Sequence, residues 1–140
     1  MIEQGFYVEK EIPQRWWVMV LCGVESDKDL DRAFGSILSA GAGRERAEKA
    51  REVLAQPNSG YIFTDSARCF SLIIISHATK YSELFNTVTH EICHLTAHIC
   101  ERFGYQPDGE KAAYIQGEIG EGMYPLVVAA VCPKCKCGEH

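Results

Sequence analysis

The sequence lacks a long hydrophobic run. Its longest apolar segments, LIIIS at 72–76 and PLVVAAVC at 125–132, are far shorter than the about 20 residues that a membrane-spanning helix needs. The N-terminal segment, MIEQGFYVEKEIPQR, lacks the basic start and the apolar stretch of a signal peptide. We therefore expect no membrane partner and a cytoplasmic location.

The chain also lacks an excess of positive charge. Its 14 Lys and Arg residues stand against 19 Asp and Glu residues, which gives a net charge of −5. A protein that binds nucleic acid usually presents a basic patch to the phosphates. The clearest basic stretch, GRERAEKAR at 43–51, alternates in sign and is typical of a solvated helix face. We therefore expect no nucleic-acid partner, which disfavours a regulator of DNA transactions.

Repeats, low-complexity tracts and linkers are absent, and 140 residues with 46% hydrophobic composition suffice for one compact core. Seven cysteines without an export signal indicate a reducing compartment, where thiols or metal ligands are more common than disulfides. The sequence predicts one domain at 1–131, followed by a cysteine-rich tail at 132–140.

Hydrophobic periodicity and turn residues predict four strands and four helices. The strands are expected at 5–12, 15–24, 60–65 and 69–77, and the helices at 26–40, 44–56, 81–103 and from 110 onward. Ser26 or Asp27 is suited to cap the first helix, and Pro125 is expected to stop or kink the last. The fold class predicted is α/β (α+β), with a mixed sheet of about four strands packed on the long helix at 81–103.

The long helix has one apolar side and one histidine side. At about 100° per residue, His90 and His94 lie about 40° apart, nearly opposite the apolar stripe. Glu91 falls at the boundary between the two sides. The stripe consists of Leu84, Val88, Ile92, Leu95, Ile99 and Phe103. One side of the helix is thus able to pack on a sheet while the other presents two imidazoles to a cleft.

His90, Glu91 and His94 form the pattern H-E-x-x-H. Two imidazoles one turn apart can bind a single zinc ion, and the adjacent carboxylate can act as a general base toward water that the metal activates. The alternative interpretation is an ordinary exposed polar helix face that binds no metal. We favour the zinc site because the motif lies mid-helix, opposite the apolar stripe.

A catalytic zinc site needs a third protein ligand. Glu110 is the leading candidate, since it opens a helix that a short loop can fold back beside the first; Glu118 is the reserve. Tyr114 shares the face of Glu110 and is suited to donate a hydrogen bond to a developing oxyanion. His98 is too far along the helix to join the same ion, so it either touches substrate or is solvated.

The segment THEICHLTAHICERFGYQPDGEKAAYIQG resembles the core of zincin metallopeptidases of the gluzincin type. The lead-in SELFNTVTHEICHL and the pattern E-x-x-A-Y-x-x-G at 110–117 are similar to small H-E-x-x-H proteins of bacteria and their phages. This resemblance covers roughly residues 70–120. It implies that His90, His94 and Glu110 are zinc ligands and that Glu91 is the general base.

The function expected from these features is that of a zinc-dependent metallopeptidase acting on a peptide or protein substrate. The strand at 69–77 is one candidate for pairing with an extended substrate. A core strand with His77 at its end is an equally good interpretation. The alternative function is a catalytically inactive, zinc-stabilised structural or interaction protein.

The tail CPKCKCGEH suggests a second metal site. Its cysteines and histidine supply four ligands of the kind that structural zinc uses, although their spacing is tighter than in common zinc fingers. These residues are Cys132, Cys135, Cys137 and His140. The alternatives are a half-site completed by another subunit and a flexible thiol-rich tail without metal.

Overall fold

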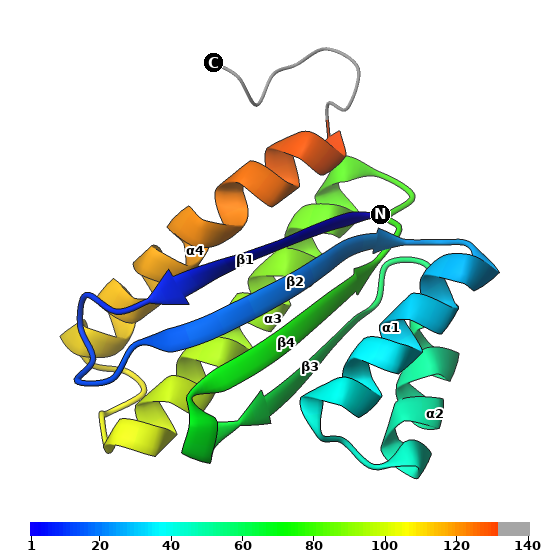
Figure 1. The fold of residues 1–140 in the computed structure, drawn as a ribbon. Helices are drawn as coiled ribbons and strands as arrows, with labels where there is room; N and C mark the ends of the chain where they lie inside the picture. The colour runs from blue at the N-terminus through cyan, green and yellow to red at the C-terminus, as the bar shows by residue number, and fades with distance from the viewer. Residues whose placement is uncertain (132–140) are drawn as a thin grey trace.

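The computed structural model describes residues 1–131 and shows a four-stranded mixed sheet with helices on both faces (Figure 1). The elements in chain order are β1 Ile2–Val8, β2 Trp16–Val24, α1 Asp27–Ala40, α2 Arg44–Leu54, β3 Gly60–Asp65, the 3-10 turn Ser66–Arg68, β4 Phe70–Ser76, α3 Tyr81–Phe103 and α4 Glu110–Val131. The fold is α+β, as the sequence predicted.

The order of strands in the sheet is β1-β2-β4-β3. The hairpin pairs β1–β2 and β3–β4 are antiparallel, and β2 runs parallel to β4 through the centre of the sheet. The fully apolar run Leu72–Ile75 therefore lies in an interior strand, which explains why both of its faces are buried. β1 and β3 are the two edge strands.

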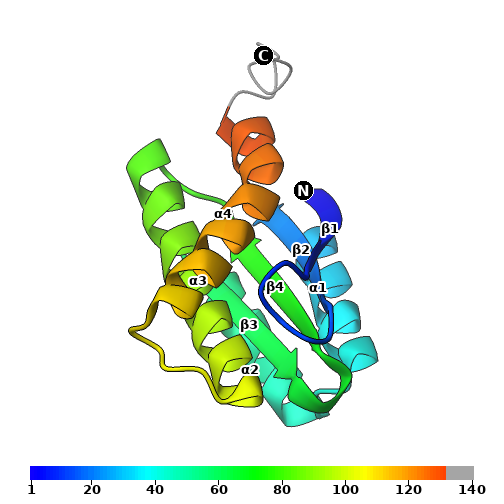
Figure 2. The same cartoon turned by 90° about the vertical axis from the view of Figure 1, so that its left-hand side faces the viewer.

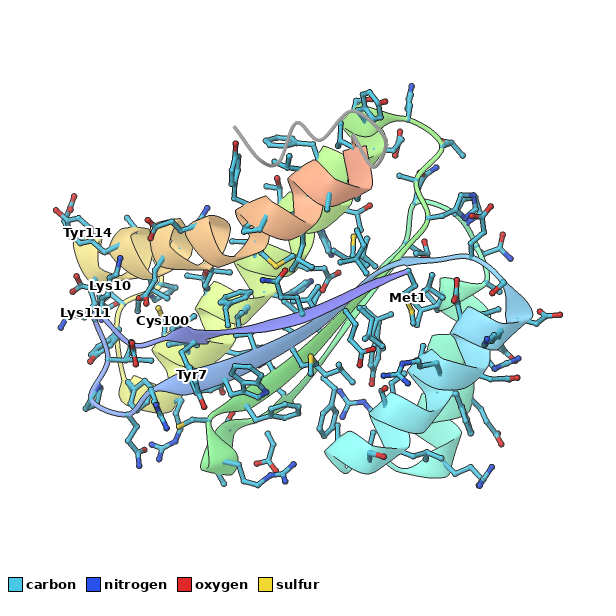
Figure 3. All side chains as sticks on the ribbon, turned by 45° about the horizontal axis from the view of Figure 1, so that its top comes forward. Met1, Tyr7, Lys10, Cys100, Lys111 and Tyr114 are labelled. Atoms are coloured by element: carbon cyan, nitrogen blue, oxygen red, sulfur yellow. The ribbon has the colours of Figure 1, made fainter. Side chains whose placement is uncertain are left out.

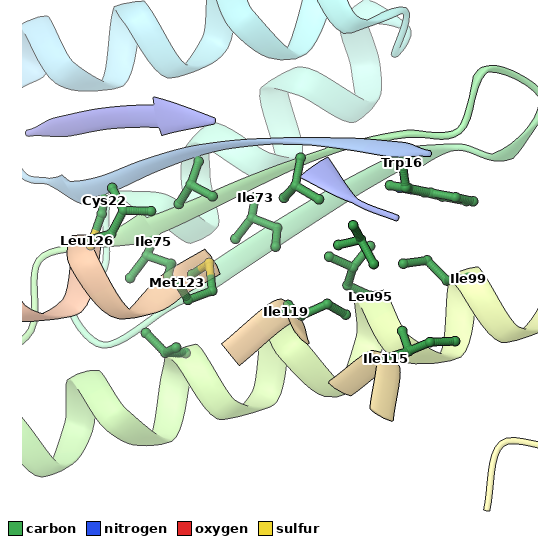
Figure 4. Close-up of a cluster of buried hydrophobic side chains, with 14 of the residues drawn as sticks. Trp16, Cys22, Ile73, Ile75, Leu95, Ile99, Ile115, Ile119, Met123 and Leu126 are labelled. Atoms are coloured by element: carbon green, nitrogen blue, oxygen red, sulfur yellow. The ribbon is translucent and has the colours of Figure 1, made fainter. Parts of the chain in front are cut away.

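Helices α3 and α4 cover one face of the sheet, and α1 and α2 lie against the other (Figure 2). The face under α3 and α4 carries the larger core, in which Trp16, Ile73 and Leu95 are fully buried (Figure 4). A second core lies between the sheet and the helices α1 and α2, around Leu21, Ile37 and Leu54. Within residues 1–131, no helix has the length and apolarity required to cross a bilayer.

Most of the predicted elements are confirmed. Ser26 caps α1 through a reciprocal pair of hydrogen bonds with Asp29, and α3 has the predicted bounds. The largest differences are at β1, which runs from Ile2 to Val8 rather than over 5–12, and at α4, which continues past Pro125 to Val131. The helix tolerates this proline because the carbonyl that loses its partner, that of Glu121, lies on the exposed side and can bind water.

Two glycines of α4 are expected to respond oppositely to alanine. A methyl group at Gly122 would overlap the ring of Phe6 in β1, so Gly122→Ala should destabilise the fold by about 1–3 kcal/mol. Gly120 has open space around it, and Gly120→Ala should stabilise the helix by about 0.5–1 kcal/mol. Chemical denaturation of both variants measures the difference, and equal shifts would contradict the packing of α4 on β1.

Candidate functional site

His90 and His94 converge on one point at the surface of α3. Leu95 and Ile99 anchor the helix in the core with no exposed area, which leaves the two histidines on the exposed side. Their Nε2 atoms are 3.0 Å apart and their rings are nearly perpendicular, at 76°. Two nitrogens bound to one tetrahedral zinc at ~2.0–2.1 Å would be about 3.3 Å apart. The pair thus fits two ligands of a single ion, and it also fits a hydrogen bond between neutral rings.

Glu91 is buried beside this pair, although the helical period placed it at the boundary of the apolar side. Its side chain is 3% exposed, and its Oε2 atom has no hydrogen-bond partner within residues 1–131. Burial raises the pKa of the Glu91 carboxyl, and the nearby charges of His90 and His94 oppose this effect. A buried carboxylate with a free oxygen is suited to accept a proton.

The position of Glu91 is set by the turn that leads into β3. Gly60, the first residue of β3, lies directly against the carboxylate, and a methyl group there would be 2.8 Å from Oε1. The hydroxyl of Thr87 lies 3.3 Å from the carbonyl oxygen of Asn58 in this turn and 3.0 Å from that of Glu83 in α3, and its one hydrogen is shared between these two acceptors. Asn58 adopts a left-handed conformation, with φ of 61°. Asn58 and Gly60 lie where the predicted helix at 44–56 gives way to the strand at 60–65 and belong to no motif, so the sequence analysis missed them as site residues.

A small hollow of about 230 Å³ opens in front of Glu91. Its lining is mostly polar and consists of Asn58, Gly60, Asn86, Thr87, His90 and Glu91. It borders β3, an edge strand with one unpaired side. The expectation that 69–77 pairs with substrate is wrong, because that segment forms β4, whose two sides are occupied by β2 and β3.

The expected third ligands do not join the histidines. Within the part of the chain that the structure describes, no group of three or more His, Cys, Asp or Glu side chains is placed to hold a metal. Glu110 is exposed at the first residue of α4, and Glu118 accepts hydrogen bonds from the backbone N–H groups of Glu9 and Lys10, at 2.8 and 3.2 Å. The reason is that α4 packs on β1, at the edge of the sheet opposite β3.

Tyr114 also lies away from the histidines. Its side chain is 61% exposed, and together with Lys10, Glu11 and Glu118 it lines a separate hollow near the β1–β2 connection (Figure 3). The prediction that it donates to an oxyanion at the site is therefore not supported by its position. His77 lines another hollow, with Met1 and Lys80, rather than the one in front of Glu91.

His98 is held by β3 rather than freely solvated. Its Nδ1 atom is 2.7 Å from the Oγ1 atom of Thr64, and the side chain is half-buried. Burial lowers the pKa of His98, the nearby positive charges of His94 and Arg46 lower it further, and Glu101 opposes them. His98 is thus an oriented imidazole, one helical turn beyond His94, in a position that favours the neutral form.

The cysteines of the domain differ sharply in exposure. Cys93, inside the motif, is exposed, whereas Cys22, Cys69 and Cys100 are buried. Burial raises the pKa of the Cys22 thiol to about 11, and the N-terminal charge only partly opposes this. The predicted tail ligands Cys132, Cys135, Cys137 and His140 lie outside the described residues.

Alkylation should distinguish these thiols. With iodoacetamide at pH 8 we expect Cys93 to react rapidly and Cys22 and Cys100 to react only after unfolding, because the thiolate is the reactive form and needs access to the reagent. Mass spectrometry of the individual peptides measures each rate. Fast labelling of Cys22 in the folded protein would contradict its burial in the core beneath α3 and α4.

Comparison with known proteins gives no relative. No protein-family model matches the chain, and no curated protein or solved structure matches it either. The similarity to gluzincins therefore rests on the sequence motifs alone, and the geometry of the site carries the functional argument.

Proposed function

We propose that this protein is a zinc-dependent hydrolase, most simply a peptidase. The observation that carries the proposal is the convergence of the His90 and His94 Nε2 atoms, 3.0 Å apart, beside a buried carboxylate with an oxygen that has no partner within residues 1–131. If the two histidines were only part of a solvated helix face, nothing would require a buried carboxylate beside them. An unsatisfied buried oxygen costs folding free energy, and such costs are concentrated at functional sites.

In this proposal each residue has one role. His90 and His94 would hold the ion through Nε2, and zinc held there would supply a Lewis acid that polarises a carbonyl and acidifies water. The carboxylate of Glu91 would accept a proton from the attacking water and pass it to the leaving amine. The low exposure of Glu91 keeps bulk water from competing for this proton.

An extended peptide is the substrate that the surroundings favour. β3 is an edge strand beside the histidines, and its free backbone groups can pair with a peptide as an added strand. Gly60 has no side chain to block approach to Glu91, so the peptide can lie close to the carboxylate. We place the reaction in the cytoplasm, in keeping with the free thiols of the four described cysteines.

Both the hydrolase and its alternative, a zinc-stabilised interaction protein without chemistry, need zinc ligands beyond the histidine pair. The described residues bring two imidazoles together without a third ligand beside them, whereas a catalytic zinc needs three protein ligands and a structural zinc usually four. Glu110 remains the proposed third ligand from the motif at 110–117, and it would have to approach the histidines when zinc binds. Zinc affinity of Glu110→Gln, with Glu118→Gln as the control, tests this assignment directly.

Metal content and peptide cleavage test the function as a whole. Protein purified without added metal should contain about one zinc per chain from the helix site, or about two if the tail also binds, and His94→Leu should lose one. Zinc-loaded protein should cleave members of a proteome-derived peptide mixture, read by mass spectrometry. Zinc content unchanged by His94→Leu would exclude the proposed metal site.

A further inference from the structure

A line of hydrogen bonds crosses the sheet and ends at His98. The indole Nε1 of Trp16 in β2 donates to the Oγ atom of Ser71 in β4, at 3.0 Å. Ser71 Oγ lies 2.7 Å from the Oγ1 atom of Thr64 in β3. Thr64 Oγ1 lies 2.7 Å from the Nδ1 atom of His98 in α3. Four elements thus contribute one residue each to a continuous chain.

The indole of Trp16 fixes the donor-to-acceptor direction of this series of hydrogen bonds. An indole N–H can only donate, so Ser71 accepts from Trp16. Ser71 has no exposed area, and its hydroxyl hydrogen finds an acceptor within residues 1–131 only at Thr64. The arrangement that gives each of these hydrogens an acceptor within residues 1–131 has Thr64 donate its own to Nδ1 of His98, 2.7 Å away. The opposite direction at the last bond would leave the Thr64 hydroxyl hydrogen without an acceptor in the described chain.

The direction of these hydrogen bonds fixes the tautomer of His98. When one ring nitrogen of a neutral imidazole accepts a hydrogen bond, the other nitrogen carries the proton. The lowered pKa of His98 agrees with a neutral ring. Its Nε2–H group makes no hydrogen bond within residues 1–131, and the side chain is only half-buried. His98 therefore presents an oriented, unused donor.

This donor lies beside the strand proposed to hold substrate. Glu91 adjoins Gly60 at the start of β3, and His98 adjoins Thr64 near its end, so α3 and β3 run alongside each other. The rings of His94 and His98 are 6.3 Å apart between centroids. Residues of an extended peptide repeat every ~3.3 Å. The donor is thus about two residues along such a peptide from the histidine pair.

We propose that His98 is a substrate-binding residue whose Nε2–H donates a hydrogen bond to a backbone carbonyl of the peptide, about two residues from the cleaved bond. This proposal rests on the proposed peptidase function. Thr64 and Ser71 are positioning residues, since they act only by orienting the ring and fixing its proton. Trp16, buried in the core, sets the direction of the hydrogen bonds that lead to His98.

The tautomer is testable without any substrate. In zinc-loaded, ¹⁵N-labelled full-length protein, the two ring nitrogens of His98 should show a protonated Nε2 and an unprotonated Nδ1, with the signals assigned by their loss in His98→Gln. Thr64→Val should give a mixture of the two tautomers, and Thr64→Ser, which keeps the hydroxyl, should not. A proton on Nδ1 in the unaltered protein would overturn the inference.

Kinetics test the substrate contact. His98→Leu should raise KM for a cleaved peptide about 3- to 10-fold and change kcat less than about twofold, as for the loss of one neutral hydrogen bond in binding. His98→Gln, which keeps an amide donor near the Nε2 position, should restore most of the affinity. Zinc content should be the same in both variants.

Each remaining outcome has a distinct meaning. An unchanged KM in His98→Leu would remove the substrate contact, and loss of zinc in that variant would make His98 a metal ligand instead. If the unaltered protein binds zinc but cleaves no peptide, the peptidase proposal fails and the substrate role of His98 fails with it. The tautomer measurement separates this case from an error in the hydrogen-bond chain.

Discussion

Replacement of Glu91 by Gln is expected to lower kcat by about 10²–10⁴-fold while zinc stays bound. The amide fills the same space as the carboxylate but cannot accept the proton that the carboxylate would take. His90 and His94, which hold the ion in this proposal, are unchanged. Zinc content by elemental analysis and turnover of a cleaved peptide, measured on the same preparation, give both parts of the result.

The same variant separates the two candidate functions. In a zinc-stabilised interaction protein, Glu91→Gln would change neither zinc content nor any turnover, because there is no reaction to lose. Unfolding is excluded as a cause by thermal denaturation of the zinc-free proteins. There Glu91→Gln should be at least as stable as the original at neutral pH, because it removes a buried charge. Loss of zinc in this variant would instead make Glu91 a ligand.

Gly60→Ala is expected to reduce kcat/KM by about 10²-fold and to destabilise the fold by about 1–3 kcal/mol. The added methyl group would be 2.8 Å from the Glu91 carboxylate and 3.1 Å from the Thr87 side chain. Glu91 must therefore move away from its place beside the histidines. Denaturation and peptide turnover measure the two effects, and zinc content should be unchanged because neither histidine is touched.

A double-mutant cycle isolates this contact. In a Glu91→Ala background the carboxylate is gone, so adding Gly60→Ala should cost at least about 1 kcal/mol less than it does alone. Gly43→Ala, at a glycine with open space around it, is the matched control and should show no such coupling. Additive effects of Gly60→Ala and Glu91→Ala would mean that β3 does not press on the carboxylate.

The elements of the fold were predictable because their signals are local. The capping box at Ser26, the apolar period of 81–103 and Gly104 with a φ of 74° after the helix each act within a few residues. α4 is the instructive exception. Pro125 was expected to stop or kink it, and it does not stop it: the helix continues past the proline to Val131, with Met123 and Leu126 buried in the core on either side.

The candidate site was predictable only in part. A spacing of four residues brings His90 and His94 together on any helix, wherever that helix packs. The partner of Glu91 was not predictable, since Gly60 is in a strand whose distance from α3 no local pattern reports. The ligand role of Glu110 was inferred from a short loop that brings α4 beside α3, but a loop does not determine which side of α3 the next helix occupies.

By itself, the sequence determined an amphipathic helix that carries two imidazoles one turn apart with a glutamate between them. Only the tertiary structure decided that Glu91 is buried, that β3 and not β4 is the free edge beside it, and that the ring of His98 is within hydrogen-bond distance of Thr64. The physical reason is that helical geometry is fixed by neighbouring residues. The arrangement of elements, in contrast, is fixed by burial of apolar surface contributed from the whole chain.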